Sequence, residues 1–475
     1  MALAIFSEAR RKWWTLAAVS FGLFMIMLDN TVVNVALPSI QAELGIGLSE
    51  LEWIVAGYAL TFAALMLTGG KLADLYGRRR VFVLGLVVFT LASLACGLAG
   101  SGAQLIGARI VQGVGAALMN PATLSIISAT FPPRQRGMAI GIWAGVSALA
   151  LAIGPLVGGL LTQHIHWSWI FFVNIPVGIV AVVASLLLID ESRDTSHEQR
   201  LDLPGLLTSG GGLFALTYAL IEANTYGWTS GRILASFAVA VVLLASFLAL
   251  ERRQRLPMLD LSLFRSRTFA GANLVILLVA LSMFGVFFFV SLYMQNVLGY
   301  SAVQAGAAFL PMTVLIILIA PLAGRATDRV GSRALMTAGM TLVAAQLLWF
   351  SRAEVDSSFW SLLPGLVIGG IGMAMTFTPA TAAAMRSVPV DKAGVGSAVL
   401  NSFRQVGGSI GIAVMGAIMA HAAAGRRTPQ AFMDGFSRSL VVAAAVAFAG
   451  AIVAFALVRP HERDETEARV GEAVA

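Results

Sequence analysis

The 475-residue chain has little charge and almost no cysteine. Asp, Glu, Lys and Arg make up 12% of the residues, while 58% are apolar and the mean hydropathy is +0.86. Soluble domains carry about 25% charge, so this composition excludes a soluble enzyme. The single cysteine, Cys96, excludes an intramolecular disulfide, and we interpret it as a small packing residue because it lies within an apolar run.

Several motifs of site chemistry are also missing. The chain has no GxxxxGK[ST] phosphate-binding loop, which excludes direct use of ATP. Its histidines, including His164 and His166, show no metal-ligand spacing, and no catalytic triad can be assigned. We therefore expect no metal and no cofactor. The pI near 10.1 would suggest nucleic acid in a soluble protein, but here the basic residues occupy short loops, and we expect no nucleic-acid partner.

Long apolar segments are abundant. A helix needs about 20 mostly apolar residues to cross a bilayer, and fourteen such segments can be assigned. The predicted spans are 13–38, 50–70, 81–100, 103–129, 137–162, 168–189, 203–222, 232–250, 268–296, 302–322, 333–351, 359–385, 393–421 and 438–458. The first is too long for a cleaved signal peptide, so we interpret it as a helix of the mature protein. The predicted fold class is an all-α membrane protein with fourteen transmembrane helices.

The loops differ strongly in positive charge. With fourteen spans, the termini and the loops on their side hold 24 of the 31 Lys and Arg residues, and the opposite loops hold 5. Because short cytoplasmic loops are enriched in Lys and Arg, both termini are predicted to be cytoplasmic. The expected location is the plasma membrane, with the lipid bilayer as surroundings.

One charged loop occurs twice. GKLADLYGRRR follows the second predicted span, GRATDRVGSRA follows the tenth, and matching positions are separated by 254 residues. NPAT at 120–123 and TPAT at 378–381 form a second, shorter internal repeat. Two six-helix bundles with two inserted helices explain this displacement. The predicted domains are 1–200, 201–255 for the inserted pair, 256–458, and a cytoplasmic tail at 459–475 that we expect to be disordered.

Asp29 is the one acidic residue that we place deep in a span, where a carboxylate costs roughly 2.5–3.5 kcal/mol on insertion scales. Burial favours its protonated form, which suits a group that binds and releases protons. The alternative is a structural acid paired with an Arg or capping a helix. Asn30 and Asn34 share the same turns and are candidate groups of a substrate cavity.

The fourth span carries a polar stripe. Arg109, Gln112 and Asn120 share one helix face, so Arg109 could polarise a proton site or bind an anion, or could simply satisfy backbone carbonyls. Arg404 and Asn401 in the thirteenth span raise the same alternatives, a transport role or a clamp between helices. We assign Gln112, Asn120, Asn401 and Arg404 to the candidate substrate cavity.

Two further motifs indicate moving parts. Gly154 and Gly158 have the spacing of closely packed membrane helices, Pro155 favours a kink, and Gly159 extends this small-residue face. The repeated loops also contain two acids, Asp74 and Asp328, and the enrichment of cytoplasmic loops in Lys and Arg does not explain them. An acid at the end of a helix can pair with basic residues or cap the N-terminus of a neighbouring helix. The candidate gating residues are Gly70, Asp74, Gly77, Arg78 and Arg79 in the first copy and Gly324, Asp328, Gly331 and Arg333 in the second.

These segments together resemble one family. LDNTVVNVALPSI, RIVQGVGAALMNPATL and GPLVGG resemble the first-helix, fourth-helix and antiporter motifs of the fourteen-span drug:proton antiporter branch of the major facilitator superfamily. WSWIFFVNIPVG, LYMQNVLGYSAVQAGAAFLP and NSFRQVGGSIG are similar to further signatures of that branch, so the resemblance covers nearly the whole chain. It implies the corresponding two-bundle fold, proton coupling through Asp29 and Arg109, and gating by Asp74. Two residues depart from the family pattern. Leu75 stands at a position that is commonly basic, and Ala150 at one that is often Gly.

The expected function is export of amphipathic compounds in exchange for protons, by a monomer that uses the proton gradient. An alternative keeps the fold but carries one endogenous metabolite, lipid or antibiotic. A membrane enzyme is a remote alternative, because no clustered acid, base or metal-ligand set is present.

Overall fold

The protein is described by a computed structural model that covers residues 8–193, 202–254, 257, 259–388, 393–423 and 428–459. Over these ranges the regular structure is entirely helical, and fourteen helices are long and apolar enough to span a membrane. The predicted fold class and number of spans are therefore confirmed. The predicted tail beyond 459 lies outside the described residues.

The helices are long and mostly unbroken. They are α1 (Glu8–Leu44), α2 (Leu48–Tyr76), α3 (Arg78–Gly97), α4 (Gly102–Thr130), α5 (Pro133–His164), α6 (Trp169–Phe172), α7 (Asn174–Leu188), α8 (Leu203–Tyr226), α9 (Gly231–Arg253), α10 (Arg267–Asn296), α11 (Ala302–Ala308), α12 (Leu310–Val330), α13 (Ser332–Phe350), α14 (Phe359–Arg386), α15 (Ala393–Ala423) and α16 (Pro429–Leu457). Two spans consist of a short and a long helix, α6 with α7 and α11 with α12. The last span begins earlier than its apolar window because Thr428 caps α16 by accepting a hydrogen bond from the Ala431 N–H.

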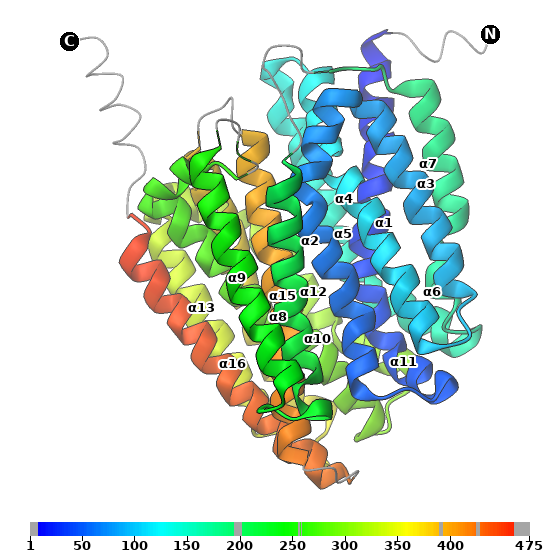
Figure 1. Ribbon diagram of the computed structural model, residues 1–475, viewed down its shortest axis with the longest axis vertical. Coiled ribbons are helices and arrows are strands. Elements are labelled where there is room, and N and C mark those ends of the chain that lie inside the picture. Colours follow the sequence, from blue (N-terminus) through cyan, green and yellow to red (C-terminus); the bar gives the residue numbers. More distant parts are fainter. Residues whose placement is uncertain are drawn as a thin grey trace. The chain divides into compact units, whose positions relative to one another are not determined.

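Contacts divide the chain into two units. The first comprises Met1–Leu259, Phe287–Leu310 and Ile412–Ala417, and the second comprises Asp260–Val286, Pro311–Gly411 and Ile418–Ala475. In the first unit α4 packs against α2 and α3, α1 against α5, and α8 against α9; α3 and α7 run side by side (Figure 1). In the second unit α13 packs against α14 and α16. The division into two six-helix bundles with an inserted pair stays a prediction.

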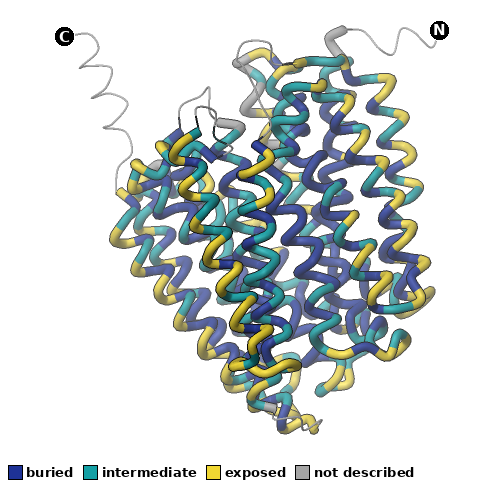
Figure 2. Tube along the Cα trace, in the orientation of Figure 1, coloured by how far each residue is buried: buried dark blue, intermediate teal, exposed yellow. Residues whose placement is uncertain are grey.

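Glycine lets the helices of each unit approach closely. A Cβ on Gly113 of α4 would lie 2.7 Å from the Tyr58 carbonyl oxygen of α2, and one on Gly372 of α14 would lie 2.9 Å from the Gly339 carbonyl oxygen of α13. Such packing at small residues drives association of membrane helices, whose apolar side chains gain little by leaving lipid. Most of α1 is buried, whereas α9 exposes much of its surface (Figure 2).

The echoed sequence motifs occupy equivalent places inside the two units. A Cβ on Gly70 of α2 would lie 3.5 Å from Pro121 of α4, and a Cβ on Gly324 of α12 would lie 3.6 Å from Thr378 of α14. Pro121 belongs to NPAT and Thr378 to TPAT. Each unit therefore brings its copy of the charged loop motif beside its copy of the second motif, as a duplicated structure requires.

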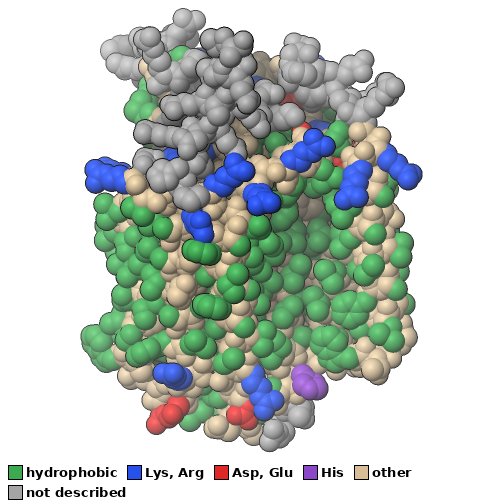
Figure 3. Space-filling view, turned by 90° about the vertical axis from the view of Figure 1, so that its left-hand side faces the viewer, with side chains coloured by type: hydrophobic (Ala, Val, Ile, Leu, Met, Phe, Trp, Pro, Cys, Tyr) green, Lys and Arg blue, Asp and Glu red, His purple; other side chains and the backbone are tan. Residues whose placement is uncertain are grey.

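The surface agrees with a membrane environment. On the face drawn in Figure 3, apolar side chains fill the middle, and Lys and Arg side chains gather along one edge. Exposed large apolar residues are spread over many helices and include Leu91, Leu187, Val241, Trp360 and Phe455. An apolar exterior of this extent is what lipid contact demands.

Candidate functional site

Asp29 and Arg109 form a buried ion pair. Arg109 Nη1 lies 2.5 Å from Asp29 Oδ2, and each residue is 1% exposed. Asp29 lies near the middle of α1 and Arg109 in the first half of α4, so two helices bring opposite charges together inside the first unit. Of the alternatives considered for Asp29, pairing with an Arg is thus the one present in this conformation.

Gln112 links the pair to α3. Its Nε2 donates to Asp29 Oδ1 at 3.0 Å and to Ser93 Oγ at 2.8 Å, and its Oε1 accepts from Arg109 Nη1 at 2.6 Å. Asn174 of α7 donates to the same Ser93 oxygen at 3.3 Å. Cys96 lies here too, with Sγ 3.7 Å from Gln112 Oε1, so it is both a buried packing residue and a neighbour of the site. Ser93 and Asn174 were not predicted, because single polar residues in apolar spans are too common to stand out.

The guanidinium has further partners. Arg109 Nε donates to the Ile54 carbonyl oxygen at 3.1 Å, and its Cζ lies 4.2 Å from the Tyr58 ring centroid and 5.7 Å from that of Phe171. Cation–π contacts of this kind strengthen where water is excluded. Arg109 therefore contacts both a backbone carbonyl and the Asp29 carboxylate. The first contact is an alternative considered for Arg109, and the second is one considered for Asp29.

The other predicted cavity residues lie outside the Asp29–Arg109 network in the contacts described below. In α1, Asn30 donates to the Ile26 carbonyl oxygen at 2.9 Å and Asn34 to that of Asn30 at 3.3 Å, so both amide nitrogens bond within their own helix. Asn120 of α4 is 3% exposed. In the second unit Asn401 donates to the Ser397 carbonyl oxygen at 3.0 Å. Arg404 is partly buried in the same helix, α15. Their substrate-binding role stays a prediction.

The first charged loop forms a compact junction. Gly77 has φ +113°, a conformation that L side chains rarely adopt, and this lets the chain turn sharply from α2 into α3. Arg78 pairs with Asp74, with Nε and Nη2 each 3.0 Å from Asp74 Oδ1. Asp74 lies in the last turn of α2 and Arg78 is the first residue of α3, so the expected loop is reduced to the turn at Gly77. Pairing with a basic residue is one of the two roles expected for Asp74.

Glu191 is a member of this junction that the sequence analysis missed. Its carboxylate accepts hydrogen bonds from the backbone N–H groups of Arg79 at 3.1 Å and Arg80 at 3.3 Å, at the first turn of α3. A carboxylate there satisfies free N–H groups and complements the helix dipole. The Arg79 side chain donates to the Ile189 carbonyl oxygen at 3.1 Å. The segment after α7 is thus fastened to the start of α3, a contact too distant in sequence to predict.

The second loop copy shares the turn of the first. Gly331 has φ +87° and lies between α12 and α13 as Gly77 lies between α2 and α3. Arg333 Cζ lies 3.9 Å from the Phe455 ring centroid, and among the described residues the matching Arg79 has no such aromatic contact. The Asp328 side chain lies outside the described part of the structure.

The glycine motif of α5 faces two helices. Toward α1, a Cβ on Gly154 would clash with Thr31, and one on Gly158 would lie 2.6 Å from the Val32 carbonyl oxygen. Toward α11, a Cβ on Gly159 would lie 2.5 Å from the Ala302 carbonyl oxygen, and one on Gly306 would clash with the Pro155 carbonyl oxygen. The expected close packing of α5 is therefore present, and its moving role stays a prediction.

Glu52 is a second deeply buried acid, although the sequence analysis placed only Asp29 deep in a span. Glu52 is 2% exposed, and a Cβ on Gly416 would clash with its carboxyl group. Glu222 of α8 is partly buried and accepts a hydrogen bond from Trp53 Nε1 at 3.2 Å. Glu52 is the third residue of the predicted span 50–70, and an acid this close to the end of a span gave no sign of burial. In the structure α2 begins at Leu48 and Glu52 lies within its first turns.

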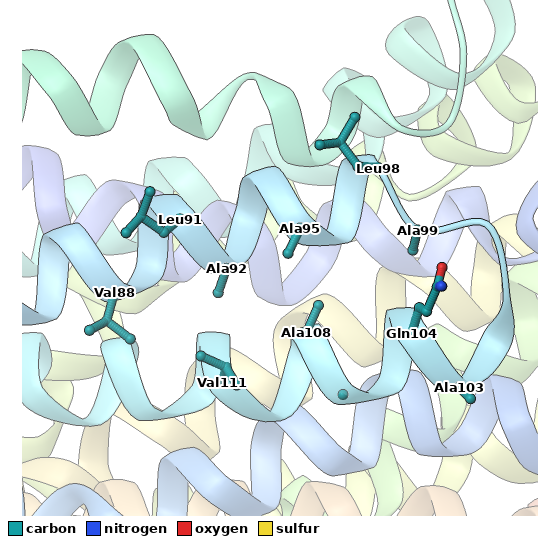
Figure 4. Close-up of a pocket in the computed structure, with 11 residues that line it drawn as sticks. Val88, Leu91, Ala92, Ala95, Leu98, Ala99, Ala103, Gln104, Ala108 and Val111 are labelled. Carbon is teal, nitrogen blue, oxygen red and sulfur yellow. The ribbon is translucent and has the colours of Figure 1, made fainter.

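The outer side of α3 and α4 forms an apolar groove of about 660 Å³. Alanine residues of the two helices point into it (Figure 4), and Gln104 is the one polar side chain among those that line it. No ionisable side chain lines the groove, so it does not belong to the Asp29–Arg109 site. Among the described residues, no group of three or more His, Cys, Asp or Glu side chains could hold a metal ion.

Helices of spanning length, an ion pair buried between two of them and duplicated charged motifs are typical of a multi-span transporter. The model of the Major Facilitator Superfamily matches residues 19–412 and, in a second match, 273–473. The chain belongs to this superfamily.

Three of the relatives are named as resistance proteins. The chain is 39% identical to the tetracenomycin C resistance and export protein of Streptomyces glaucescens, over 86% of this chain and 76% of the relative. It is 39% identical to the multidrug resistance protein Stp of Mycobacterium tuberculosis, with the same coverage. It is 37% identical to the puromycin resistance protein pur8 of Streptomyces alboniger, over 96% of this chain and 93% of the relative.

Solved structures agree on the fold. A bacterial homologue of the human lysosomal transporter Spinster, inward-facing and occupied, matches with TM-score 0.68 and 17% identity over 96% of this chain and 98% of its own. A peptide transporter in complex with sulfate matches with TM-score 0.68 and 13% identity over 98% and 95%. At these identities the likeness shows the fold alone.

Proposed function

We propose that this protein exports amphipathic compounds across the plasma membrane in exchange for protons, by alternating access. The observation that carries proton coupling is the Asp29–Arg109 pair, buried in the first unit and linked through Gln112 to α3. The names of the relatives support export, since they describe resistance to antibiotics and, in one case, export.

The ion pair supplies a coupling mechanism. A proton that reaches Asp29 removes its charge and leaves Arg109 buried without a counter-ion, which costs about 3–5 kcal/mol in comparable buried pairs. The bundle lowers this cost by rearranging, so that water or a cargo dipole reaches the guanidinium. Release of the proton restores the pair. Protonation of one carboxyl thus favours a different conformation, as a proton-driven exchange cycle requires.

The remaining motifs fit supporting roles. The junction of Asp74, Arg78 and Glu191 would hold the end of α2 to the start of α3 in one state and release in another. The packed face of Gly154, Pro155, Gly158 and Gly159 would seal against α1 and α11. Both termini would be cytoplasmic, with the basic loops on their side, and the transporter would work as a monomer without a cofactor.

The cargo range has two candidates. A broad range is favoured by the likeness to the multidrug resistance protein Stp, and a single antibiotic by the likeness to relatives named for tetracenomycin C and puromycin. Export of a panel containing puromycin, ethidium and a neutral dye separates them. Several unrelated compounds carried at similar rates would establish the broad range, and one compound carried alone would establish the narrow one.

The coupling is tested in everted vesicles with an imposed pH gradient. We expect Asp29→Asn to abolish gradient-driven accumulation of the carried compound, while exchange without a gradient continues and shows that the protein is folded. The control is Asp356→Asn, which alters an exposed acid in the loop before α14 and should transport as the unmodified protein does. Undiminished uphill accumulation by Asp29→Asn would remove Asp29 from the coupling mechanism.

A further inference from the structure

Three ionisable side chains meet where α2 nears its end, α8 begins and α9 ends. Asp202 directly precedes α8 and is 8% exposed, and Glu251 lies in the last turn of α9 and is 3% exposed. Lys71 of α2 donates from Nζ to the Pro257 carbonyl oxygen at 3.0 Å and interacts electrostatically with both carboxyl groups. None of the three belongs to the Asp29–Arg109 network.

The hydrogen bonds of the two acids are incomplete. Asp202 Oδ1 accepts from the Gly205 N–H and from Gln254 Nε2, both at 2.8 Å, and Glu251 Oε2 accepts from the Leu259 N–H at 2.8 Å. The other oxygens, Asp202 Oδ2 and Glu251 Oε1, are buried and have no donor among the described residues. Both lie within 2.8 Å of the point where a Cβ on Gly205 would be, so they share one small space.

One bound proton would satisfy both of these unpartnered oxygens. Two carboxylates this close in a buried place cannot both stay ionised, and one proton turns two acceptors into an O–H···O hydrogen bond. Asp202 is the ionised partner. Burial raises its pKa, but the hydrogen bonds from Gln254, Gly205 and Glu251 and the charge of Lys71 outweigh this, and its pKa lies below the ordinary value. This direction favours a proton bonded to Glu251 Oε1 and hydrogen-bonded to Asp202 Oδ2.

We propose that Asp202 and Glu251 form a proton-binding site in which one proton is shared between Asp202 Oδ2 and Glu251 Oε1 and Lys71 balances the remaining charge. With the proton bound, one carboxylate faces one ammonium group and the site is neutral. Loss of the proton to water leaves two carboxylates and one ammonium group. Arg252 and Arg253, the next residues after Glu251, are exposed and do not enter the site.

The site links three segments, so its protonation state controls their attachment. The protonated pair joins the start of α8 to the end of α9, and Lys71 and Glu251 tie Pro257 and Leu259 to the same place. When pH rises and the proton leaves, carboxylate repulsion and competition for Lys71 weaken these contacts. The junction is therefore firm at lower pH and loosens as pH increases.

The test uses the full-length protein in lipid vesicles and does not depend on transport. Infrared spectra recorded across a pH series detect the C=O stretch of a protonated carboxyl, and hydrogen–deuterium exchange follows the Leu259 amide. For the unmodified protein we expect the band to fade as pH rises, with exchange, corrected for its intrinsic rate, accelerating about tenfold through loss of one hydrogen bond. Glu251→Gln should lack this band and show protection that does not change with pH.

Two further variants make the result decisive. Asp190→Asn removes an exposed acid after α7 and should behave as the unmodified protein does. Lys71→Met removes the balancing charge, so the carboxyl band should persist to a pH about one unit higher, a tenfold shift in proton affinity. The proposal is overturned if Glu251→Gln retains the full band, if exchange at Leu259 in the unmodified protein ignores pH, or if Lys71→Met leaves the midpoint in place.

Discussion

At the scale of single residues, the buried Asp29–Arg109 pair has the largest energetic consequences. Taking both ions out of water is costly, and the pair persists because Gln112 and the Ile54 carbonyl oxygen complete its hydrogen bonds. Removing one partner leaves the other charge buried and unpaired, which costs more than removing both. In an ion pair the cost of removing one partner exceeds the cost of removing both, whereas the costs of removing two independent polar residues simply add.

We predict that Arg109→Gln and Asp29→Asn each lower the free energy of unfolding by about 3–5 kcal/mol, whereas the double variant loses less than the sum of the two. The measurement is unfolding of the purified protein in mixed micelles for all four members of the cycle. Asp356→Asn serves as an exposed control and should change stability by less than about 0.5 kcal/mol. Strictly additive losses would show that the two charges do not depend on one another.

At the scale of helices, α5 shows why particular glycines cannot be replaced. Gly158 lies against the backbone of α1, so an added methyl group has no flexible side chain to displace. Gly145 lies on the same helix, and a Cβ there would meet no atom of the described residues within 4 Å. The two positions share a helix and a residue type and differ in their neighbours.

Gly158→Ala is therefore expected to force α1 and α5 apart, with a loss of roughly 1–3 kcal/mol in stability and a large fall in transport. Gly145→Ala should leave transport intact and raise stability by roughly 0.5–1 kcal/mol, because Ala is the better helix former. Thermal unfolding and uptake by everted vesicles measure both. Equal effects at the two positions would mean that the contact with α1 is unimportant.

At the scale of the whole molecule, fourteen spans and the asymmetry of Lys and Arg predict the orientation in the membrane. Short loops rich in Lys and Arg stay on the cytoplasmic side. The loop between α8 and α9 lies on the side with few Lys and Arg residues, and the segment after α7 lies on the side with many. Thr229 and Arg193 are exposed representatives of the two sides.

We predict that a membrane-impermeant thiol reagent added to whole cells labels Thr229→Cys and spares Arg193→Cys. Everted vesicles should give the reverse pattern, because their cytoplasmic face is outside. The unmodified protein is the control, since Cys96 is buried and should react in neither preparation. Labelling of Arg193→Cys in intact cells would place the termini outside and invalidate the charge argument.

The sequence by itself determined the properties that depend on local composition. Apolar length specified fourteen spans, because a helix must satisfy its own backbone in lipid. The repeated motifs indicated a duplication, and the contacts of Gly70 and Gly324 agree with it. Asp29 and Arg109 were identifiable one at a time, because each ionisable residue in an apolar span is costly enough to be noticed.

Only the tertiary structure decided which of these residues meet. The pairing of Asp29 with Arg109, the capping of α3 by Glu191, the burial of Glu52 and the facing oxygens of Asp202 and Glu251 all join residues distant along the chain or on different helices. Hydropathy and charge patterns give a residue's depth in the membrane and leave its direction around the helix axis open. That direction is set by packing against other helices, and it decides whether a buried acid finds an arginine, a backbone N–H or another acid.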